Sequence, residues 1–234
     1  MTNAKYAIIS AAIVAASVTA AQAQLFVGTD TFGRAASVEF QVDGNALVVK
    51  LTNIATGDTL VPIDVLTGVY WSMTGSGTLS ADSALLNAGS IVIYDSAPVG
   101  GVVGGEFAFK SGLSHHNANF GISSSGLGIF GPGDRFPGDN LAGPTTPDGL
   151  QYGIVTAGDN AATGNGGVLG SEGLIKNSVV FRLGGFNTGF NLSSIANVGF
   201  QYGTSVTEPY VQVPAPASLA AFSFMCAASL RRRR

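Results

Sequence analysis

Short runs of β-forming residues, separated by Gly, Asn and Asp, recur along the chain from about residue 36 to residue 203. The run at 36–42, ASVEFQV, places Val38, Phe40 and Val42 at alternate positions, which is the pattern of a strand with one buried face. Between the two ends, no segment keeps the spacing of an amphipathic helix for three turns. We therefore expect seven to ten short strands and an all-β fold, as a single β-sandwich or jelly-roll-like domain.

One hairpin and one long loop are predicted from residue type. Asp43-Gly44-Asn45 separates the first run from ALVVKLTN at 46–53, and these residues favour a tight turn between paired strands. Residues 131–149 contain four prolines and five glycines, which predicts a surface loop and not a central strand. A short helical turn is expected within 81–89, ADSALLNAG. Further strands are expected within 61–73, 90–95, 105–110, 117–124, 150–158, 178–186 and 197–203.

The N-terminal segment has the pattern of a secretory signal peptide. Lys5 precedes an uncharged, mostly apolar run, which ends at the small-x-small sequence Ala21-Gln22-Ala23. Cleavage is expected after Ala23, so that residues 1–23 are removed and Gln24 becomes the new N-terminus. The expected partners are the Sec translocase and signal peptidase. The alternative is an N-terminal helix that belongs to the core.

The C-terminal segment combines a Pro-x-Pro element, an apolar stretch and a block of positive charge. Residues 219–230 would form a helix of about 18 Å, too short for a hydrocarbon core of about 30 Å. Arginines resist translocation, so we expect a transient, membrane-inserted intermediate with the arginines on the cytoplasmic side. The residues of this signal are Val213, Pro214, Ala215, Pro216, Ser218, Arg231, Arg232, Arg233 and Arg234.

This order of elements resembles the PEP-CTERM sorting signal of exosortase-dependent surface proteins, with Ala215 in place of the Glu that names the family. Much of 66–209, including GISSSGLGIFGPGDRFPG, also looks like a family of such surface proteins. The resemblance implies that an exosortase processes residues 213–234 of a bacterial protein whose body, 24–212, reaches the cell surface or extracellular matrix. It implies no chemical activity and supplies no catalytic residues. A plain tail anchor is the alternative.

Charge and cysteine content limit what the body can do. Residues 24–212 carry six basic and 14 acidic residues, a net charge of −8, and this argues against a nucleic-acid partner. The single cysteine, Cys226, lies in the apolar tail, so the body has neither a disulfide nor a catalytic thiol. Attachment of a lipid to Cys226 is an alternative to its being a small apolar residue.

Three residue patterns have the composition of a chemical site. His115 and His116 are neighbours, and neighbours in a strand point to opposite faces, so they are not expected to share a metal ion. The serines at 123–125 are interpreted as a polar turn and not as part of a catalytic triad. Gly126, Gly128 and Gly131 match a nucleotide-binding spacing but lack the strand-turn-helix context.

No cofactor is expected, with one alternative: a structural Ca²⁺ bound by loop oxygens. Its candidate ligands are Asp134, Asp139, Asp148 and Asp159. No catalysis is inferred. The expected role is structural or interactive, in contact with exopolysaccharide or other surface components. Two alternatives are kept: a secreted carbohydrate-binding module and a secreted hydrolase, which would need paired carboxylates in a cleft. The glutamates available for such a pair are Glu39, Glu106, Glu172 and Glu208.

Overall fold

The computed structural model describes residues 23–75, 77–125, 139–141, 147, 149–170, 173–187, 191–204 and 208–214. Within these ranges the chain forms two β-sheets, and its helical parts are short 3₁₀ turns. The expected all-β class is therefore confirmed. The turns are η1 (Pro62–Asp64), η2 (Val99–Gly101) and η3 (Leu192–Ser194).

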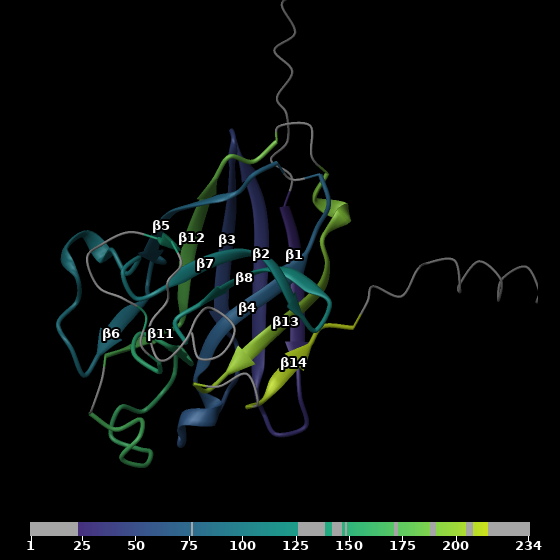
Figure 1. The fold of residues 1–234 in the computed structure, drawn as a ribbon. Coiled ribbons are helices and arrows are strands. Elements are labelled where there is room, and N and C mark those ends of the chain that lie inside the picture. The colour runs from purple at the N-terminus through teal and green to yellow at the C-terminus, as the bar shows by residue number, and fades with distance from the viewer. Residues whose placement is uncertain are drawn as a thin grey trace, which may run out of the picture.

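One sheet has five strands and is antiparallel throughout. It lies behind the other sheet in Figure 1, with its strands nearly vertical. In spatial order its strands are β1 (Ala23–Thr29), β2 (Ala35–Asp43), β3 (Ala46–Asn53), β12 (Ser178–Gly184) and β5 (Ser80–Leu86).

The second sheet has nine strands, many of them only two or three residues long. Its centre is β4 (Leu66–Ser72), which pairs with β8, β10 and β13. All of its pairings are antiparallel except that of β10 with β11. The other strands are β6 (Ile91–Ile93), β11 (Leu174–Lys176), β10 (Ile154–Val155), β8 (Ala118–Ser123), β7 (Ala108–His115), β9 (Asp139–Asn140), β13 (Ala196–Tyr202) and β14 (Tyr210–Gln212).

The two sheets pack face to face around one apolar core, which gives a β-sandwich-like arrangement. The front strands cross the rear strands obliquely in Figure 1. Phe40 of the rear sheet meets Trp71 of the front sheet with ring centroids 5.3 Å apart, and Phe107 meets Phe181 at 5.0 Å. All four side chains are fully buried. The alternating apolar positions read from the sequence are the inward-facing ones, because Val38 and Phe40 have no exposed surface.

The predicted hairpin between the first two runs is confirmed. Asp43 pairs with Ala46, so that Gly44 and Asn45 form the turn between β2 and β3. Gly44 has a φ of 61°, in the left-handed region that glycine enters without strain. Residues 46–53 form β3 with the predicted bounds.

The helical turn predicted within 81–89 is wrong. Residues 80–86 form strand β5, which pairs with β12 and buries Ala84 completely. The Ala- and Leu-rich composition favours a helix locally, but pairing with a neighbouring strand supplies the backbone hydrogen bonds and decides the conformation. Four strands were also missed at the sequence level: β1, β9, β11 and β14.

Several predictions fall outside the described residues. The expected signal helix lies in 1–22 and the expected tail helix in 215–234. Of the predicted loop at 131–149, the structure describes 139–141, 147 and 149. Here Asp139 and Asn140 form a two-residue edge strand beside β7, which agrees with the expectation that this segment holds no central strand. None of the helical turns in the described part of the chain has the length and apolar character needed to cross a membrane.

Candidate functional site

A pocket of about 260 Å³ opens where the β1–β2 loop, the segment after β3 and the η1 turn come together. We call it the Arg34 pocket. Its lining combines one aromatic ring with hydroxyl, amide and carboxylate groups. The lining residues are Phe32, Gly33, Arg34, Asn53, Ala55, Thr56, Gly57, Asp58, Thr59, Asp64 and Thr156.

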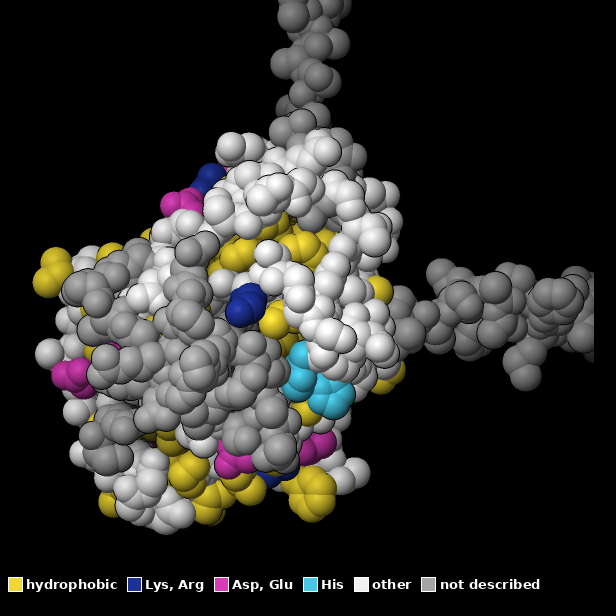
Figure 2. Space-filling model, in the orientation of Figure 1, with side chains coloured by type: hydrophobic (Ala, Val, Ile, Leu, Met, Phe, Trp, Pro, Cys, Tyr) yellow, Lys and Arg dark blue, Asp and Glu magenta, His cyan; other side chains and the backbone are white. Residues whose placement is uncertain are grey.

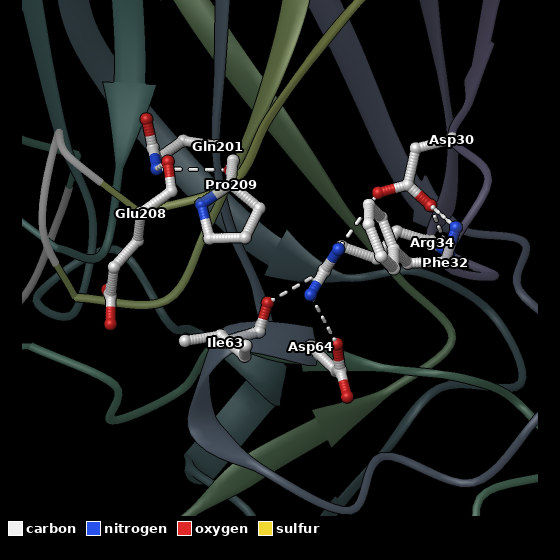
Figure 3. Close-up of polar contacts among 8 residues, drawn as sticks. All are labelled: Asp30, Phe32, Arg34, Ile63, Asp64, Gln201, Glu208 and Pro209. Atoms are coloured by element: carbon white, nitrogen blue, oxygen red, sulfur yellow. Dashed lines mark hydrogen bonds and ion pairs between the residues drawn. The ribbon is translucent and has the colours of Figure 1, made fainter.

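Arg34 is the charged residue that organises the pocket. Its side chain is 8% exposed and has three partners on two segments, as Figure 3 shows. Nη1 contacts Asp30 Oδ2 at 2.9 Å and Nη2 contacts Asp64 Oδ1 at 3.0 Å, while Nε donates to the Ile63 carbonyl oxygen at 3.0 Å. A guanidinium group held by three partners has one orientation, so it fixes the β1–β2 loop against the η1 turn.

Asp30 shapes the loop that carries Phe32. Its Oδ1 accepts the backbone N–H of Phe32 at 2.8 Å and that of Arg34 at 3.0 Å, so one carboxylate closes the turn from within. Burial by itself would raise the pKa of Asp30, but the hydrogen bonds from the Arg34 side chain and from these two N–H groups lower it below its ordinary value. The loop is therefore built around an ionised Asp30.

Phe32 projects from this loop and is 82% exposed, the only aromatic residue among the exposed large apolar side chains of the described ranges. The guanidinium carbon of Arg34 lies 5.7 Å from the centre of its ring. In Figure 3 the ring is seen close to both Asp30 and the guanidinium group, which are in direct contact with each other. An aromatic ring so exposed gains little from the core, so its place at the rim of a polar pocket indicates a binding surface.

Hydrogen bonds to a segment about 100 positions later in the sequence, residues 159–163, hold the opposite wall of the pocket in place. Asp159 Oδ1 accepts the N–H of Thr59 at 2.6 Å, and Asp58 accepts the N–H of Asn160 at 3.1 Å and the hydroxyl of Thr163 at 3.3 Å. Buried Asn53 donates to the Ile154 carbonyl oxygen at 2.9 Å. Both walls are thus held by side-chain hydrogen bonds before any ligand arrives.

The two histidines are placed differently from the sequence-based expectation. His116 lies in the turn after β7 with a φ of 47°, in the left-handed region of backbone conformation. This conformation places its ring on the same side of the sheet as the ring of His115. The ring of His116 stacks on that of Tyr210 at 4.0 Å, and His115 lies 5.2 Å from the same ring. Figure 2 shows both histidines together on the surface of the front sheet. Among the described residues, no group of three or more His, Cys, Asp and Glu has the arrangement of a metal site.

The serines at 123–125 are buried, and each hydroxyl donates to backbone carbonyl oxygens. Ser123 Oγ reaches the oxygens of Ser125 and Thr67, and Ser125 Oγ reaches that of Thr204 at 2.6 Å. Ser123 is the last residue of β8, so these hydroxyl groups satisfy buried backbone carbonyl oxygens where the strand ends. The glycines 126, 128 and 131 lie outside the described residues.

Of the calcium candidates, Asp159 is described in full. It is buried, with its carboxylate on Thr59 and its carbonyl oxygen accepting from Lys176 Nζ at 2.6 Å. Asp139 is described through its backbone pairing with Phe109. Asp134 and Asp148 lie outside the described residues.

Three of the four glutamates lie in the described ranges. Glu39 Oε2 contacts Lys50 Nζ at 2.6 Å, and Glu208 accepts the N–H of Thr204. Glu172 is outside the described residues. Glu106 lines a second pocket, of about 440 Å³, together with Asp95 and Tyr152. The Tyr152 hydroxyl donates to Asp95 at 3.2 Å, and burial together with Asp95 raises the pKa of Tyr152 to about 12.

Among the expected processing residues, Ala23 and Gln24 are the first residues of β1, paired with Gln41 and Phe40. Val213 donates its N–H to the Val198 carbonyl oxygen at 2.9 Å, and Pro214 follows it as the last described residue. Ala21, Ala215, Pro216, Ser218 and Arg231–Arg234 lie outside the described residues.

The sequence-level reasoning missed Phe32, Arg34, Asp58 and Asp64. A signal was present in DTFGR at 30–34, where an aromatic residue stands alone in a turn of Asp and Gly and cannot belong to an alternating strand pattern. The pairing of Arg34 with Asp64, 30 positions further along, carries no local signal.

Comparison with known proteins gives no match to a family model, to a curated protein or to a solved structure.

Proposed function

We propose that this chain is an exported bacterial surface or matrix protein, whose β-sandwich body has a structural or interaction role and whose C-terminal segment is processed by an exosortase. The single observation that supports this best is that the strands of the folded body lie between the two expected processing segments. Strand β1 begins at Ala23 and the last described strand ends at Gln212. Removal of 1–23 would cost β1 only its first pair, Ala23 with Gln41.

The polar pocket supports an interaction role more than a catalytic one. Its carboxylates are engaged: Asp30 and Asp64 with Arg34, and Asp58 with Asn160 and Thr163. Groups held in this way make a preformed recognition surface. The proposal includes helices in the two outer segments and a jelly-roll-like classification of the sandwich. It includes no cofactor.

The test is mass spectrometry of both termini of the protein recovered from fractionated cells of a host that carries an exosortase. The expected surface form begins at Gln24 and has lost the four arginines. A matched variant replaces Arg231 to Arg234 by Gln and is expected to accumulate in the unprocessed form. Recovery of the intact arginine block in the surface form, or normal processing of the Gln variant, would overturn the proposal.

A further inference from the structure

We propose that the Arg34 pocket binds one neutral pyranose unit of a polysaccharide, with the exposed ring of Phe32 against the face of the sugar. This deepens the proposed function by naming the class of partner. It rests on that function only for the location, the cell surface or matrix, at which the protein would meet the polysaccharide. The inference rests on four observations on the pocket: the aromatic platform, the fixed polar lining, the charge and the size.

The first observation is the platform. Phe32 is 82% exposed, but the loop beneath it is rigid because Asp30 holds the N–H groups of Phe32 and Arg34. The C–H groups on one face of a pyranose are apolar and carry a slight positive charge, which matches the negative face of an aromatic ring. A ring that is fixed before binding loses little conformational entropy when a sugar covers it.

The second observation is the polar lining. Thr56, Asp58 and Asp64 all line the pocket, and Asp64 contacts Arg34 through one of its two oxygens. Hydroxyl groups of a sugar are both donors and acceptors, so they suit a wall that alternates hydroxyl, amide and carboxylate groups. The hydrogen bonds from Asn160 and Thr163 keep Asp58 in place.

The third observation is charge, and it separates neutral sugars from charged ligands. Asp58 and Asp64 line the pocket and outnumber Arg34, which is also paired with Asp30 behind the lining, so a uronate, sulfate or phosphate group would be repelled. A cationic side chain would gain no contact with the Phe32 ring on the face that the Arg34 guanidinium already occupies, 5.7 Å from the ring centre.

The fourth observation is size. The volume of about 260 Å³ lies just below the range of about 300–1,000 Å³ for drug-sized ligands, so it suits a single sugar unit. The pocket lies at the end of the sandwich, among the loops. A polysaccharide could therefore present one residue to the pocket while the rest of its chain continues outside.

The test is titration calorimetry on the purified full-length chain. The probes are glucose, galactose, mannose, N-acetylglucosamine and their oligomers, with oligouronates and a lysine-rich peptide as charged competitors. We expect at least one neutral sugar to bind with a Kd of about 1 mM. Phe32→Ala should weaken this binding about tenfold, while Phe32→Trp keeps it. The matched control is Leu25→Ala, which removes a side chain of 63% exposure from the outer face of β1 and should leave the Kd unchanged.

Three results would overturn the inference: no neutral sugar of the panel binds at about 10 mM, ten times the expected Kd; binding persists unchanged in Phe32→Ala; or only the uronates or the peptide bind. Because the titration uses purified protein, its outcome does not depend on export or on processing of the tail. The terminal mass measurement tests those steps separately.

Discussion

The ring of Phe40 meets that of Trp71 edge to face across the interior, with centroids 5.3 Å apart, and joins β2 of one sheet to β4 of the other. Trp71 also stacks on Phe120 at 5.9 Å, so the contact is part of an aromatic group at the centre of the core. Because the body has no cysteine, no disulfide joins the two sheets, which are held by such burial together with hydrogen bonds like that of Asn53 with the Ile154 carbonyl oxygen.

Replacing Phe40 by Ala should lower the free energy of unfolding by about 3–5 kcal/mol, because it leaves a cavity between the sheets. Urea denaturation followed by tryptophan fluorescence would measure this directly, since Trp71 is the only tryptophan. The control is Phe32→Ala, which removes a largely exposed ring and should change stability by less than about 1 kcal/mol. Equal losses in the two variants would contradict this account of the core.

Gly121 in β8 is required by the way Tyr70 lies over it. A Cβ at residue 121 would stand 2.6 Å from Tyr70 Cδ1 and 3.0 Å from Leu113 Cδ1. Gly121→Ala should therefore destabilise the protein by about 1–3 kcal/mol, through overpacking. Gly158→Ala is the matched control, because a Cβ there has nothing within 4 Å. Thermal unfolding of both variants, followed by circular dichroism, tests the difference.

Arg34→Met should lower the free energy of unfolding by about 2 kcal/mol. The change leaves Asp30 and Asp64 without their shared partner, but the cost is below the 3–5 kcal/mol typical of a fully buried pair because both carboxylates keep contact with water. Arg34→Lys should recover only part of this loss, since an ammonium group cannot reach all three partners in the geometry of the guanidinium group. Full recovery by Lys, measured by urea denaturation, would contradict a role for the three-way contact.

Stability should fall as the pH is lowered through the range in which His115 titrates. Burial lowers the pKa of His115 below 6.5 and His116 lowers it further, while a hydrogen bond with Gln201 acts in the opposite direction. The unfolded chain then binds the proton more tightly than the folded one. The stabilisation from neutral His115 is therefore complete above pH 6.5 and is lost as the pH falls through the folded pKa.

Urea midpoints measured from pH 7.5 to pH 5 would show this slope. His115→Gln should flatten it, because the substitution removes the titrating group. The groups that face His115 are His116, Tyr70 and Tyr210. An unchanged slope in His115→Gln would assign the effect to another residue.

The fold class could be predicted because its evidence is local. Alternation in 36–42 fixed the inward face of β2, and Asp43-Gly44-Asn45 fixed the turn to β3. Strand β5 could not be predicted, since its Ala- and Leu-rich sequence favours a helix until β12 lies beside it. Strand β9 is two residues long, too short for any periodic pattern, whereas the equally short β10 lies within the strand expected at 150–158.

The Arg34 pocket could not be predicted from the sequence, for a related reason. Its walls come from residues far apart in the sequence: Arg34 meets Asp64, and Thr59 meets Asp159. A single sequence carries no signal for such pairings. What could have been noticed is Phe32, a large apolar residue in a turn that offers it no place in a core.

Strand β14 also sets how the body would respond to pulling. It is three residues long, and among the described strands it pairs only with β13. A load that entered through Pro214 would first act on the bond between Val213 and Val198, and then on the pairs of Gln212 with Gly199 and Val211 with Phe200. If the protein were tethered there, this strand would peel away bond by bond. Tension would release it while the aromatic centre around Trp71 stayed intact.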